Sequence, residues 1–294
     1  MKTIYTYLFS ALLLLAFTAC QKQSEQLLLG GSGWNKIVIV DKATKQIVWE
    51  HPLEKGWECN SVARTADGKI LFSYSKGAKL ITADHQELWN IAAPAGCEMQ
   101  TARILPDGNI LLAWCGSPAC IMEVDQQGQI LSKTTYDTGI EHSHAQFRQV
   151  NKAKNGNYLI PLFATHDVRE VNPQGELVKS IEVGGTPFST ALLANGNYLV
   201  ACGDGHAYIE LNWETGEVVR RVEEKAIEGG RLFFVAQLCP TANGGTYICN
   251  WQGHDGEAAQ LHFPQLLEVD AQGQMIWSLN DNSTFGMIST ICPF

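Results

Sequence analysis

Histidine is the residue type whose distribution in this chain most directly suggests chemistry. The chain has eight histidines, and His142, His144 and His206 lie in polar, glycine- or serine-containing segments typical of loops. A neutral imidazole accepts and releases a proton near pH 7, which suits a general base or a nucleophile. We therefore predict these three residues as catalytic candidates.

A second set of side chains is of the kind that holds a metal ion. His166 precedes Asp167, and His254 precedes Asp255. Neutral imidazoles with a nearby carboxylate suit a divalent transition metal, the carboxylate either binding the metal or orienting an imidazole. His166, His254 and Asp255 are thus predicted metal ligands. No spacing here is diagnostic, so a divalent metal and metal-free catalysis are both open.

A third group of polar and aromatic residues can hold a ligand without catalysis. They lie near the starts of predicted inner strands or in loops, and they are Glu58, Asn60, Glu98, Gln100, Gln146, Gln237, Trp251 and Arg231. Glu58 and Glu98 occupy matching positions in successive repeats, so their carboxylates can act together on a cation or on each other's pKa. Aromatic rings such as that of Trp251 offer flat faces to a sugar or an aryl ligand.

Two alternating sequence signals describe the elements that must position these residues. The first is an Asp-Gly or Asn-Gly turn followed by a β run, and it begins at Asp67, Asp107, Asn155, Asn195 and Asn243. Such dipeptides supply the positive φ angles of tight hairpins. The second is an apolar run that ends before another turn, at Asp41, Asp84, Asp125, Asn172, Asn212 and Asp270.

The second signal recurs six times, at intervals of 40 to 58 residues. Each interval holds two hairpins and hence four short strands, which is typical of a β-propeller blade. The predicted fold is all-β, a six-bladed β-propeller of four-stranded antiparallel blades over residues 27–294. A β-sandwich is the second choice, because it does not predict the repeat.

Closure of the ring is predicted from the two ends of the chain. Residues 286–292 resemble the segments that precede the other turns. This C-terminal stretch should therefore form the innermost strand of the blade whose outer strands lie within residues 27–50. Such closure removes the sheet edges that an open array would expose.

The strand order also predicts where a site lies. Turns between the first and second and between the third and fourth strands share one face, which we call the bottom face. Connections between blades and loops between the second and third strands form the opposite, top face, where binding is expected. Seven histidines are expected on the top face, with His85 in a bottom turn; the seven are His51, His142, His144, His166, His206, His254 and His262.

The first 19 residues are mostly apolar after Lys2 and are too short to span a bilayer comfortably, as in a signal peptide. They lead into Phe17-Thr18-Ala19-Cys20, which resembles the lipobox of bacterial lipoproteins. The resemblance implies a signal peptide over residues 1–19, lipidation of Cys20 and a tether over residues 20–26. The expected location is the bacterial cell envelope, anchored to the outer membrane on its periplasmic or surface side.

Charge and cysteine content narrow the environment further. The formal net charge is −9, from 21 Lys and Arg against 30 Asp and Glu, so no basic surface for nucleic acid is expected. Eight cysteines follow Cys20, and an envelope location permits disulfides among them. Cys115 and Cys120 flank four residues typical of a hairpin and are the one pair predicted to form a bridge.

Two segments carry a family resemblance. Asp41-Lys42-Ala43-Thr44-Lys45-Gln46-Ile47-Val48-Trp49 and Asn212-Trp213-Glu214-Thr215-Gly216 are similar to the tryptophan-docking motif of quinoprotein-type (PQQ-like) propellers, with Trp89 and Trp277 at equivalent places. In that family the tryptophan packs between blades. Lys45 replaces the usual Gly, Arg220 stands where Trp would, and the chain is too short for eight blades. The resemblance therefore implies the fold, and PQQ is not expected.

The hairpin pattern is equally similar to arylsulfotransferase-like propellers, a resemblance that implies a histidine acting as nucleophile or general base. The leading hypothesis is nevertheless a membrane-anchored binding module whose top face takes a small molecule, a glycan or an envelope protein. The alternative is an envelope enzyme, arylsulfotransferase-like or a metal-assisted hydrolase or lyase, that uses the top-face histidines. Fold alone does not choose between them.

Overall fold

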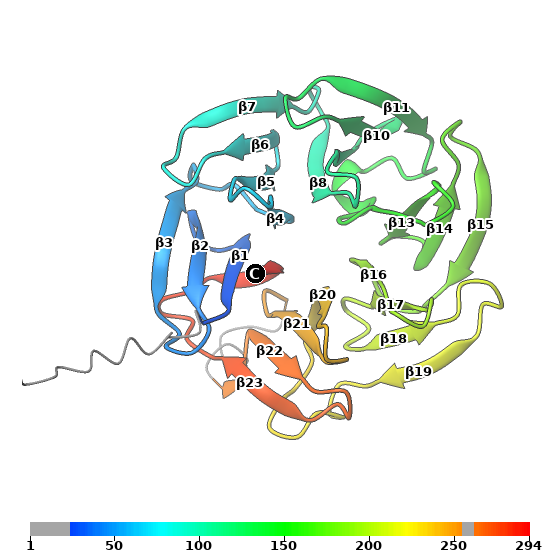
Figure 1. Cartoon of the computed structure of the whole chain (residues 1–294). Helices are drawn as coiled ribbons and strands as arrows, with labels where there is room; N and C mark the ends of the chain where they lie inside the picture. Colours follow the sequence, from blue (N-terminus) through cyan, green and yellow to red (C-terminus); the bar gives the residue numbers. More distant parts are fainter. Residues whose placement is uncertain (1–23, 255–261) are drawn as a thin grey trace, which may run out of the picture.

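A computed structural model of the protein describes residues 24–254 and 262–294. These residues form six four-stranded antiparallel sheets, which are arranged as blades around a central channel (Figure 1). The inner strands surround the channel, and the outermost strands follow the circumference. The predicted six-bladed propeller is confirmed. No helix among the described residues is long and apolar enough to cross a membrane.

The first three blades contain the following strands, in order from the channel outward. Blade 1 consists of β24 (Met287–Pro293), β1 (Gln26–Ser32), β2 (Lys36–Asp41) and β3 (Ile47–Pro52). Blade 2 consists of β4 (Val62–Arg64), β5 (Ile70–Tyr74), β6 (Gly77–Ile81) and β7 (Glu87–Ala92). Blade 3 consists of β8 (Glu98–Ile104), β9 (Ile110–Cys115), β10 (Ala119–Val124) and β11 (Ile130–Tyr136).

The remaining three blades follow the same order. Blade 4 is preceded by the 3-10 helix η1 (Ser143–Ala145) and consists of β12 (Asn151–Lys152), β13 (Tyr158–Leu162), β14 (Asp167–Val171) and β15 (Leu177–Glu182). Blade 5 consists of β16 (Thr190–Leu192), β17 (Tyr198–Ala201), β18 (Tyr208–Leu211) and β19 (Val218–Val222). Blade 6 consists of β20 (Phe234–Pro240), β21 (Thr246–Trp251), β22 (Leu266–Val269) and β23 (Met275–Leu279).

The C-terminal strand closes the ring, as the chain ends predict. β24 pairs antiparallel with β1, with Leu28 opposite Cys292 and Leu29 opposite Ile291. The innermost strand of blade 1 is therefore the last strand of the chain, while its other three strands are the first. This pairing joins the two ends of the domain and gives blade 1 its fourth strand.

The core lies between neighbouring blades, so the second and third strands of a blade are buried on both faces. In β9 every residue is buried. Leu111 and Ala113 pack toward blade 4, whereas Ile110 and Leu112 pack toward blade 2. Because successive side chains of a strand point to opposite faces, a strand between two blades must be apolar at every position.

Side chains on the outer strands connect each blade to the next. Trp49, Trp89 and Trp277 each donate from Nε1 to a backbone carbonyl in the last turn of the following blade, at 2.8, 3.1 and 3.0 Å. The structural role that the resemblance implies for these tryptophans is thus observed. Between blades 5 and 6 the guanidinium of Arg220 takes this place, beside Gly273.

The recurring Asn-Gly-Asn turns donate hydrogen bonds to a glutamate on the third strand of the same blade. The side chains of Asn155 and Asn157 donate to Glu170 Oε1 at 2.7 and 2.6 Å, and Trp213 of blade 5 donates to its other oxygen at 2.6 Å. Burial alone would raise the pKa of Glu170, but these three donors hold it below its usual value. The two asparagine contacts recur one blade on, where Asn195 and Asn197 donate to Glu210, so the repeated motif serves the bottom face.

The predicted bridge between Cys115 and Cys120 is wrong. All eight cysteines among the described residues are unpaired. Cys120 lies opposite Trp114 in the ladder, so Cys115 is one residue out of register with it. Cys115 packs with the core toward blade 4, and Cys120 with the core toward blade 2. A one-residue offset puts two side chains on opposite faces of a sheet, which prevents a bond.

His51 is also placed differently from its prediction. It lies within the outer strand β3 and not in a top loop. Its ring is stacked with that of His85 in the bottom turn of blade 2, with the two Nδ1 atoms 3.1 Å apart. The predicted signal peptide and Cys20 lie outside the described residues, as does Asp255.

Candidate functional site

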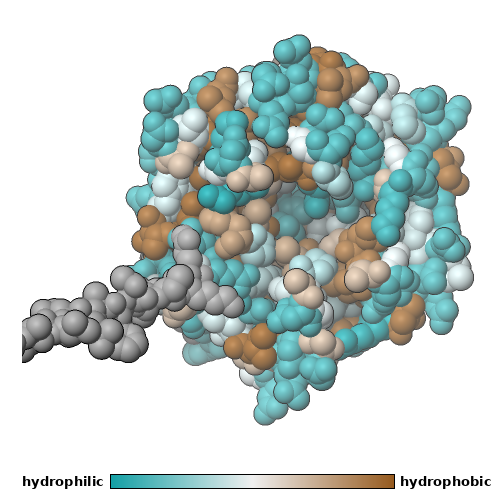
Figure 2. Space-filling model, in the orientation of Figure 1, coloured by the Kyte–Doolittle hydropathy of each residue, from teal (hydrophilic) through white to brown (hydrophobic). Residues whose placement is uncertain are grey.

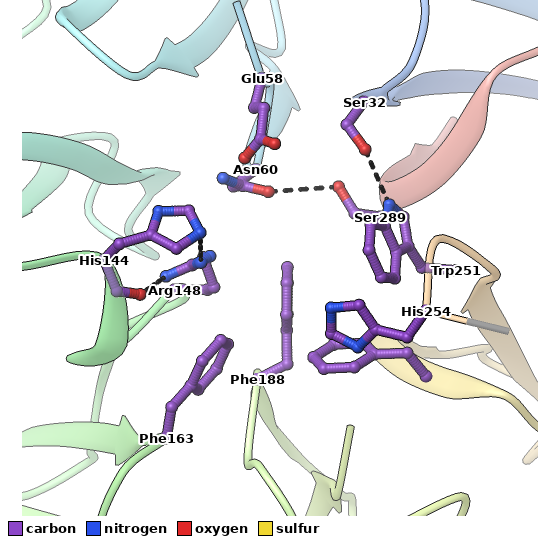
Figure 3. A pocket seen from close by; sticks show the side chains of 11 residues that line it. Ser32, Glu58, Asn60, His144, Arg148, Phe163, Phe188, Trp251, His254 and Ser289 are labelled. Atoms are coloured by element: carbon purple, nitrogen blue, oxygen red, sulfur yellow. Dashed lines mark hydrogen bonds between the residues drawn. The ribbon is translucent and has the colours of Figure 1, made fainter. Parts of the chain in front are cut away.

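A cavity opens at the centre of the top face, where the inner ends of the blades meet (Figure 3). Figure 2, in the orientation of Figure 1, shows the opposite face of the molecule, which is also hollowed at its centre. The top cavity has about 450 Å³ of empty space, its open mouth included. Its walls are partly polar and partly aromatic, and they comprise Ser32, Glu58, Asn60, His144, Arg148, Phe163, Phe188, Phe234, Trp251, His254 and Ser289.

The aromatic wall comes from blades 4, 5 and 6. The rings of Phe163, Phe188 and Phe234 lie 5.9 to 6.2 Å apart, centroid to centroid. Trp251 stands edge-on to Phe234 at 5.5 Å, and its Nε1 donates to Ser32 Oγ at 2.8 Å. The indole is therefore held by a hydrogen bond across the boundary between blades 6 and 1, and its ring adds to the apolar surface.

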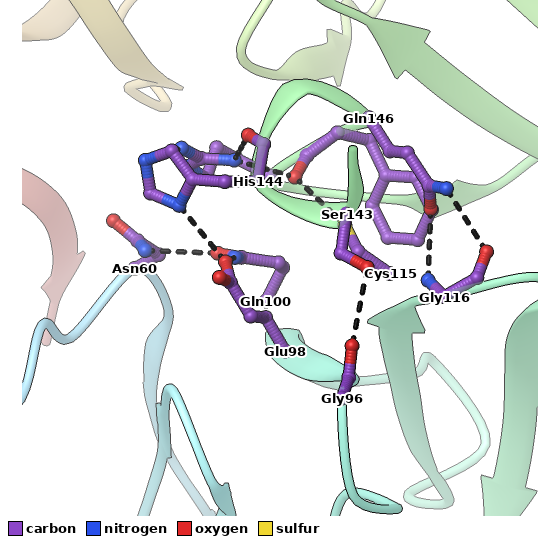
Figure 4. A network of polar contacts seen from close by, with 11 residues as sticks. Asn60, Gly96, Glu98, Gln100, Cys115, Gly116, Ser143, His144 and Gln146 are labelled. Atoms are coloured by element: carbon purple, nitrogen blue, oxygen red, sulfur yellow. Dashed lines mark hydrogen bonds and ion pairs between the residues drawn. The ribbon is translucent and has the colours of Figure 1, made fainter. Parts of the chain in front are cut away.

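His144, on the polar wall, is held between two charged side chains (Figure 4). Its Nδ1 is 2.9 Å from Glu98 Oε2, and its Nε2 is 2.9 Å from a terminal nitrogen of Arg148. Because a guanidinium only donates, Nε2 must be the unprotonated acceptor, and Nδ1 must donate to the carboxylate. The contacts thus assign a neutral imidazole. Its one available lone pair, on Nε2, already accepts the hydrogen bond from Arg148.

Arg148 is 6% exposed and lines the cavity. Three of its five N–H groups donate to the carbonyls of His144 and Phe147 and to the His144 ring. Its guanidinium also lies 4.6 Å from the centre of the Phe163 ring. Among the described residues no carboxylate makes a hydrogen bond to it, so two N–H groups have no protein acceptor.

Burial works against the charge of this guanidinium. It lowers the pKa of Arg148, and the nearby Glu58 and Glu98 partly offset the effect. An arginine stays charged even so. The cavity therefore contains a buried cation whose direct partners are neutral.

A second histidine faces the cavity from blade 6. His254 Nδ1 lies 2.7 Å from Asp204 Oδ1, and its ring is edge-on to Trp251 at 4.8 Å. A carboxylate at Nδ1 orients an imidazole and leaves Nε2 as its basic nitrogen. The described residues give Nε2 no hydrogen-bond partner. This pair has the arrangement of a general base.

Buried amide side chains form the floor of the top cavity. Asn60 donates to Gln100 at 2.9 Å, and Gln100 donates to Glu98 at 3.0 Å. Below them, Gln149 is 1% exposed and donates to the carbonyl of Asn60 and to Gln237 at 2.7 and 3.0 Å. This network fills the middle of the channel and fixes the polar wall above it.

The structure brings many of the predicted site residues together. Those that line the top cavity are Glu58, Asn60, His144, Trp251 and His254. Those in the network behind it are Glu98, Gln100 and Gln237.

Three other predicted residues lie away from the cavity walls. Gln146 is buried between blades 3 and 4, where it bonds to both the N–H and the carbonyl of Gly116. Arg231 pairs with Glu224 at 2.5 Å. His206 Nδ1 lies 3.2 Å from a backbone carbonyl in the connection to blade 6.

His142 lies at the start of a short helical segment. Residues 143–145 form η1, and His142 is the exposed residue preceding it. His166 is exposed, with a positive φ of 58°, and its Nδ1 lies 2.5 Å from the carbonyl of Gly185.

Only two of the three predicted metal ligands lie among the described residues. Within residues 24–254 and 262–294, no three His, Cys, Asp or Glu side chains come together in a way that could hold a metal ion. His166 and His254 contact Gly185 and Asp204 respectively. Asp255 lies outside the described residues, so this metal site stays a prediction.

Sequence reasoning missed Arg148, Phe163 and Phe188. Arg148 carried a usable signal, because it is a charged residue within an otherwise uncharged run that leads into an inner strand, and such a charge requires a partner or a function. The two phenylalanines gave no such signal, since apolar residues at strand ends are common in any propeller.

The fold and the top cavity define a β-propeller with a partly polar and partly aromatic cavity at the mouth of its channel. The chain belongs to the Mal s 1 allergenic protein-like family, whose family model matches residues 32–274. A crystal structure of a protein of unknown function from Bacteroides caccae is similar to it, with 66% identity and a TM-score of 0.90 over 92% of this chain and 99% of that one. No functionally curated protein shows significant similarity.

Two more distant solved structures share the fold alone. Virginiamycin B lyase from Staphylococcus aureus with quinupristin is 11% identical, with a TM-score of 0.60 over 90% of this chain and 87% of that one. A chain of a nidogen/laminin complex is 11% identical, with a TM-score of 0.64 over 92% and 98%. At such identities the likeness carries no residue roles.

Proposed function

We propose that the protein is a ligand-binding propeller of the bacterial cell envelope, tethered by a lipid on Cys20. Its top cavity takes a small molecule that has a flat apolar or aromatic body and an anionic group. The lipobox-like segment at residues 17–20 supports the envelope location. The cavity is concave and combines aromatic walls with a few polar and charged groups, as small-molecule sites do.

Arg148 carries the proposal. Its direct partners are two carbonyls and a neutral imidazole, and two of its N–H groups have no acceptor among the described residues. A buried guanidinium is costly unless a charge or good acceptors compensate it. A carboxylate, sulfate or phosphate group on the ligand supplies both, in the planar geometry that arginine prefers.

The remainder of the ligand is inferred from the opposite wall. Phe163 lies against the guanidinium, and Phe188, Phe234 and Trp251 continue this aromatic wall across the cavity. Such a wall stacks on aromatic or other flat apolar groups. A concave cavity of this kind favours a small molecule over the flat surface of a protein partner.

The test compares aromatic carboxylates with their neutral amides. We expect phenylacetate and indole-3-acetate to raise the melting temperature of the soluble domain, residues 24–294, while phenylacetamide and indole-3-acetamide do not. Arg148→Met should weaken carboxylate binding by about 10- to 100-fold, because a charge-assisted contact is worth about 1.5–3 kcal/mol. Arg231→Met is the matched control. Equal effects of acids and amides on the wild-type protein would contradict the proposal.

A second candidate function rests on His254 and Asp204. The carboxylate at Nδ1 leaves Nε2 of His254 basic at the edge of the same cavity. This arrangement supports proton abstraction from a bound ligand, as a hydrolase or lyase requires. His254→Gln and Asp204→Asn should then abolish conversion of a ligand, followed by mass spectrometry, while its binding persists. Binding without conversion in the wild-type protein would favour the binding module.

A further inference from the structure

A second cavity opens at the bottom end of the channel, below the buried amide network. It has about 820 Å³ of empty space, its mouth included, and it is lined mainly by the inner strands β4, β8, β20 and β24. Arg64 and Arg103 are the charged residues among those that line it, and no lining residue is acidic. The bottom cavity is thus a basic site in a chain whose net charge is negative.

Arg103 lacks a counterion in this cavity. Its guanidinium donates one hydrogen bond, to Gln149 Oε1 at 3.3 Å, and its Nε is buried without a partner. Burial lowers the pKa of Arg103, and the nearby groups that oppose this effect are the thiols of Cys239 and Cys292. Burial raises the pKa of Cys239 to about 12 and also raises that of Cys292, so both thiols are neutral near pH 7.

Arg64, the second arginine of the bottom cavity, packs against an aromatic ring and a turn. The Arg64 guanidinium lies 4.2 Å from the centre of the Phe294 ring. It also lies beside Gly68, where the Cβ of any larger residue would touch it. Its positive charge adds to the field at the mouth of the cavity, whereas the deeper Arg103 has most of its N–H groups free of protein acceptors.

We infer that the bottom cavity binds an oxyanion, namely a carboxylate, sulfate or phosphate group, at the guanidinium of Arg103. Such a group accepts two parallel hydrogen bonds from an arginine and neutralises its charge. Gln237 and Gln149 fix the wall behind the arginine, because their amides are committed to one another and to neighbouring backbone. This site is separate from the top cavity, since the amide network lies between the two.

Selenate is a suitable probe, because it is a sulfate analogue that can be counted by elemental analysis. After equilibrium dialysis of the domain at constant ionic strength, the wild-type protein and the control variant Arg231→Met, whose arginine lies outside both cavities, should retain the same selenate. Arg103→Met should retain about one selenate per chain less than either. Equal retention by Arg103→Met and the wild-type protein would show an adventitious ion only and would overturn the inference.

Thermal unfolding supplies a second readout. In chloride buffer, Arg103→Met should melt at or above the wild-type temperature, because it removes a partly buried charge that has no counterion among the described residues of the cavity. Sulfate should raise the melting temperature of the wild-type protein and of Arg231→Met more than that of Arg103→Met. If Arg103→Met does not fold, Arg103→Gln, which retains a donor for Gln149, takes its place with the same expectations. A variant that is strongly destabilised in chloride and gains as much from sulfate as the wild-type protein would refute the site.

Discussion

Arg148 donates to Nε2 of His144 at 2.9 Å, and this contact decides what His144 can do. With Nδ1 directed at Glu98, the imidazole has no lone pair left for a substrate or a metal. A residue that sequence reasoning proposed as catalytic thus has a positioning role in this structure. It aligns the guanidinium that faces the cavity.

This relationship predicts how His144 variants behave. His144→Gln should retain binding of an aromatic carboxylate, because its amide can donate to Glu98 and accept from Arg148. His144→Phe, which can do neither, should weaken binding by about tenfold, the value of one lost hydrogen bond. Isothermal titration with indole-3-acetate measures both. Equal binding by the two variants would remove His144 from the site.

The stacked pair of His51 and His85 predicts a pH dependence of stability. Burial, followed by the charges of His85 and Lys79, lowers the pKa of His51. The folded protein therefore binds fewer protons than the unfolded chain, so stability is highest above the unfolded pKa of about 6.5 and falls as the pH drops through the folded value. Between about pH 7.5 and about pH 5.5, the melting temperature of His51→Phe should fall less than that of the wild-type protein. A parallel loss in both proteins would contradict the assignment.

Trp277 joins the last blade to the first, and its removal should loosen the closed ring. Trp277→Phe keeps most of the ring packing but loses the hydrogen bond to the Lys42 carbonyl, at a cost of about 1 kcal/mol. Trp277→Ala also loses packing and should cost more, up to about 3–5 kcal/mol. Urea unfolding of both variants measures the difference. Val219→Ala, an exposed outer-strand change, should have little effect.

Labelling of the cysteines tests whether the domain contains a disulfide. All eight in the described residues are unpaired, and burial raises the pKa of Cys59 and Cys115 to about 12. The domain should therefore react slowly with iodoacetamide when folded, because the thiolate is the reactive form. Unfolded without reductant, it should take up eight labels, counted by mass spectrometry. Six labels or fewer would show a disulfide.

Much of the fold is a local property of the sequence. The Asp-Gly and Asn-Gly turns, the strands between them and their six-fold recurrence are read within short windows, because hairpin chemistry depends on neighbouring residues. Even ring closure was predictable, since residues 286–292 repeat the pattern of an inner strand that the N-terminal blade lacks. Trp49 and Trp89 likewise occupy the inter-blade positions that their motif implies.

The site was decided by tertiary structure. Arg148 and His254 are far apart in the sequence and line the same cavity only because the ring brings the inner ends of separate blades to one channel mouth. Likewise, an offset of one residue places Cys115 and Cys120 on opposite faces of their sheet. The sequence by itself therefore determined the repeats and their closure, which arise from local backbone preferences. Only the tertiary structure decided which side chains share a cavity and which protons they hold, because these depend on contacts between blades.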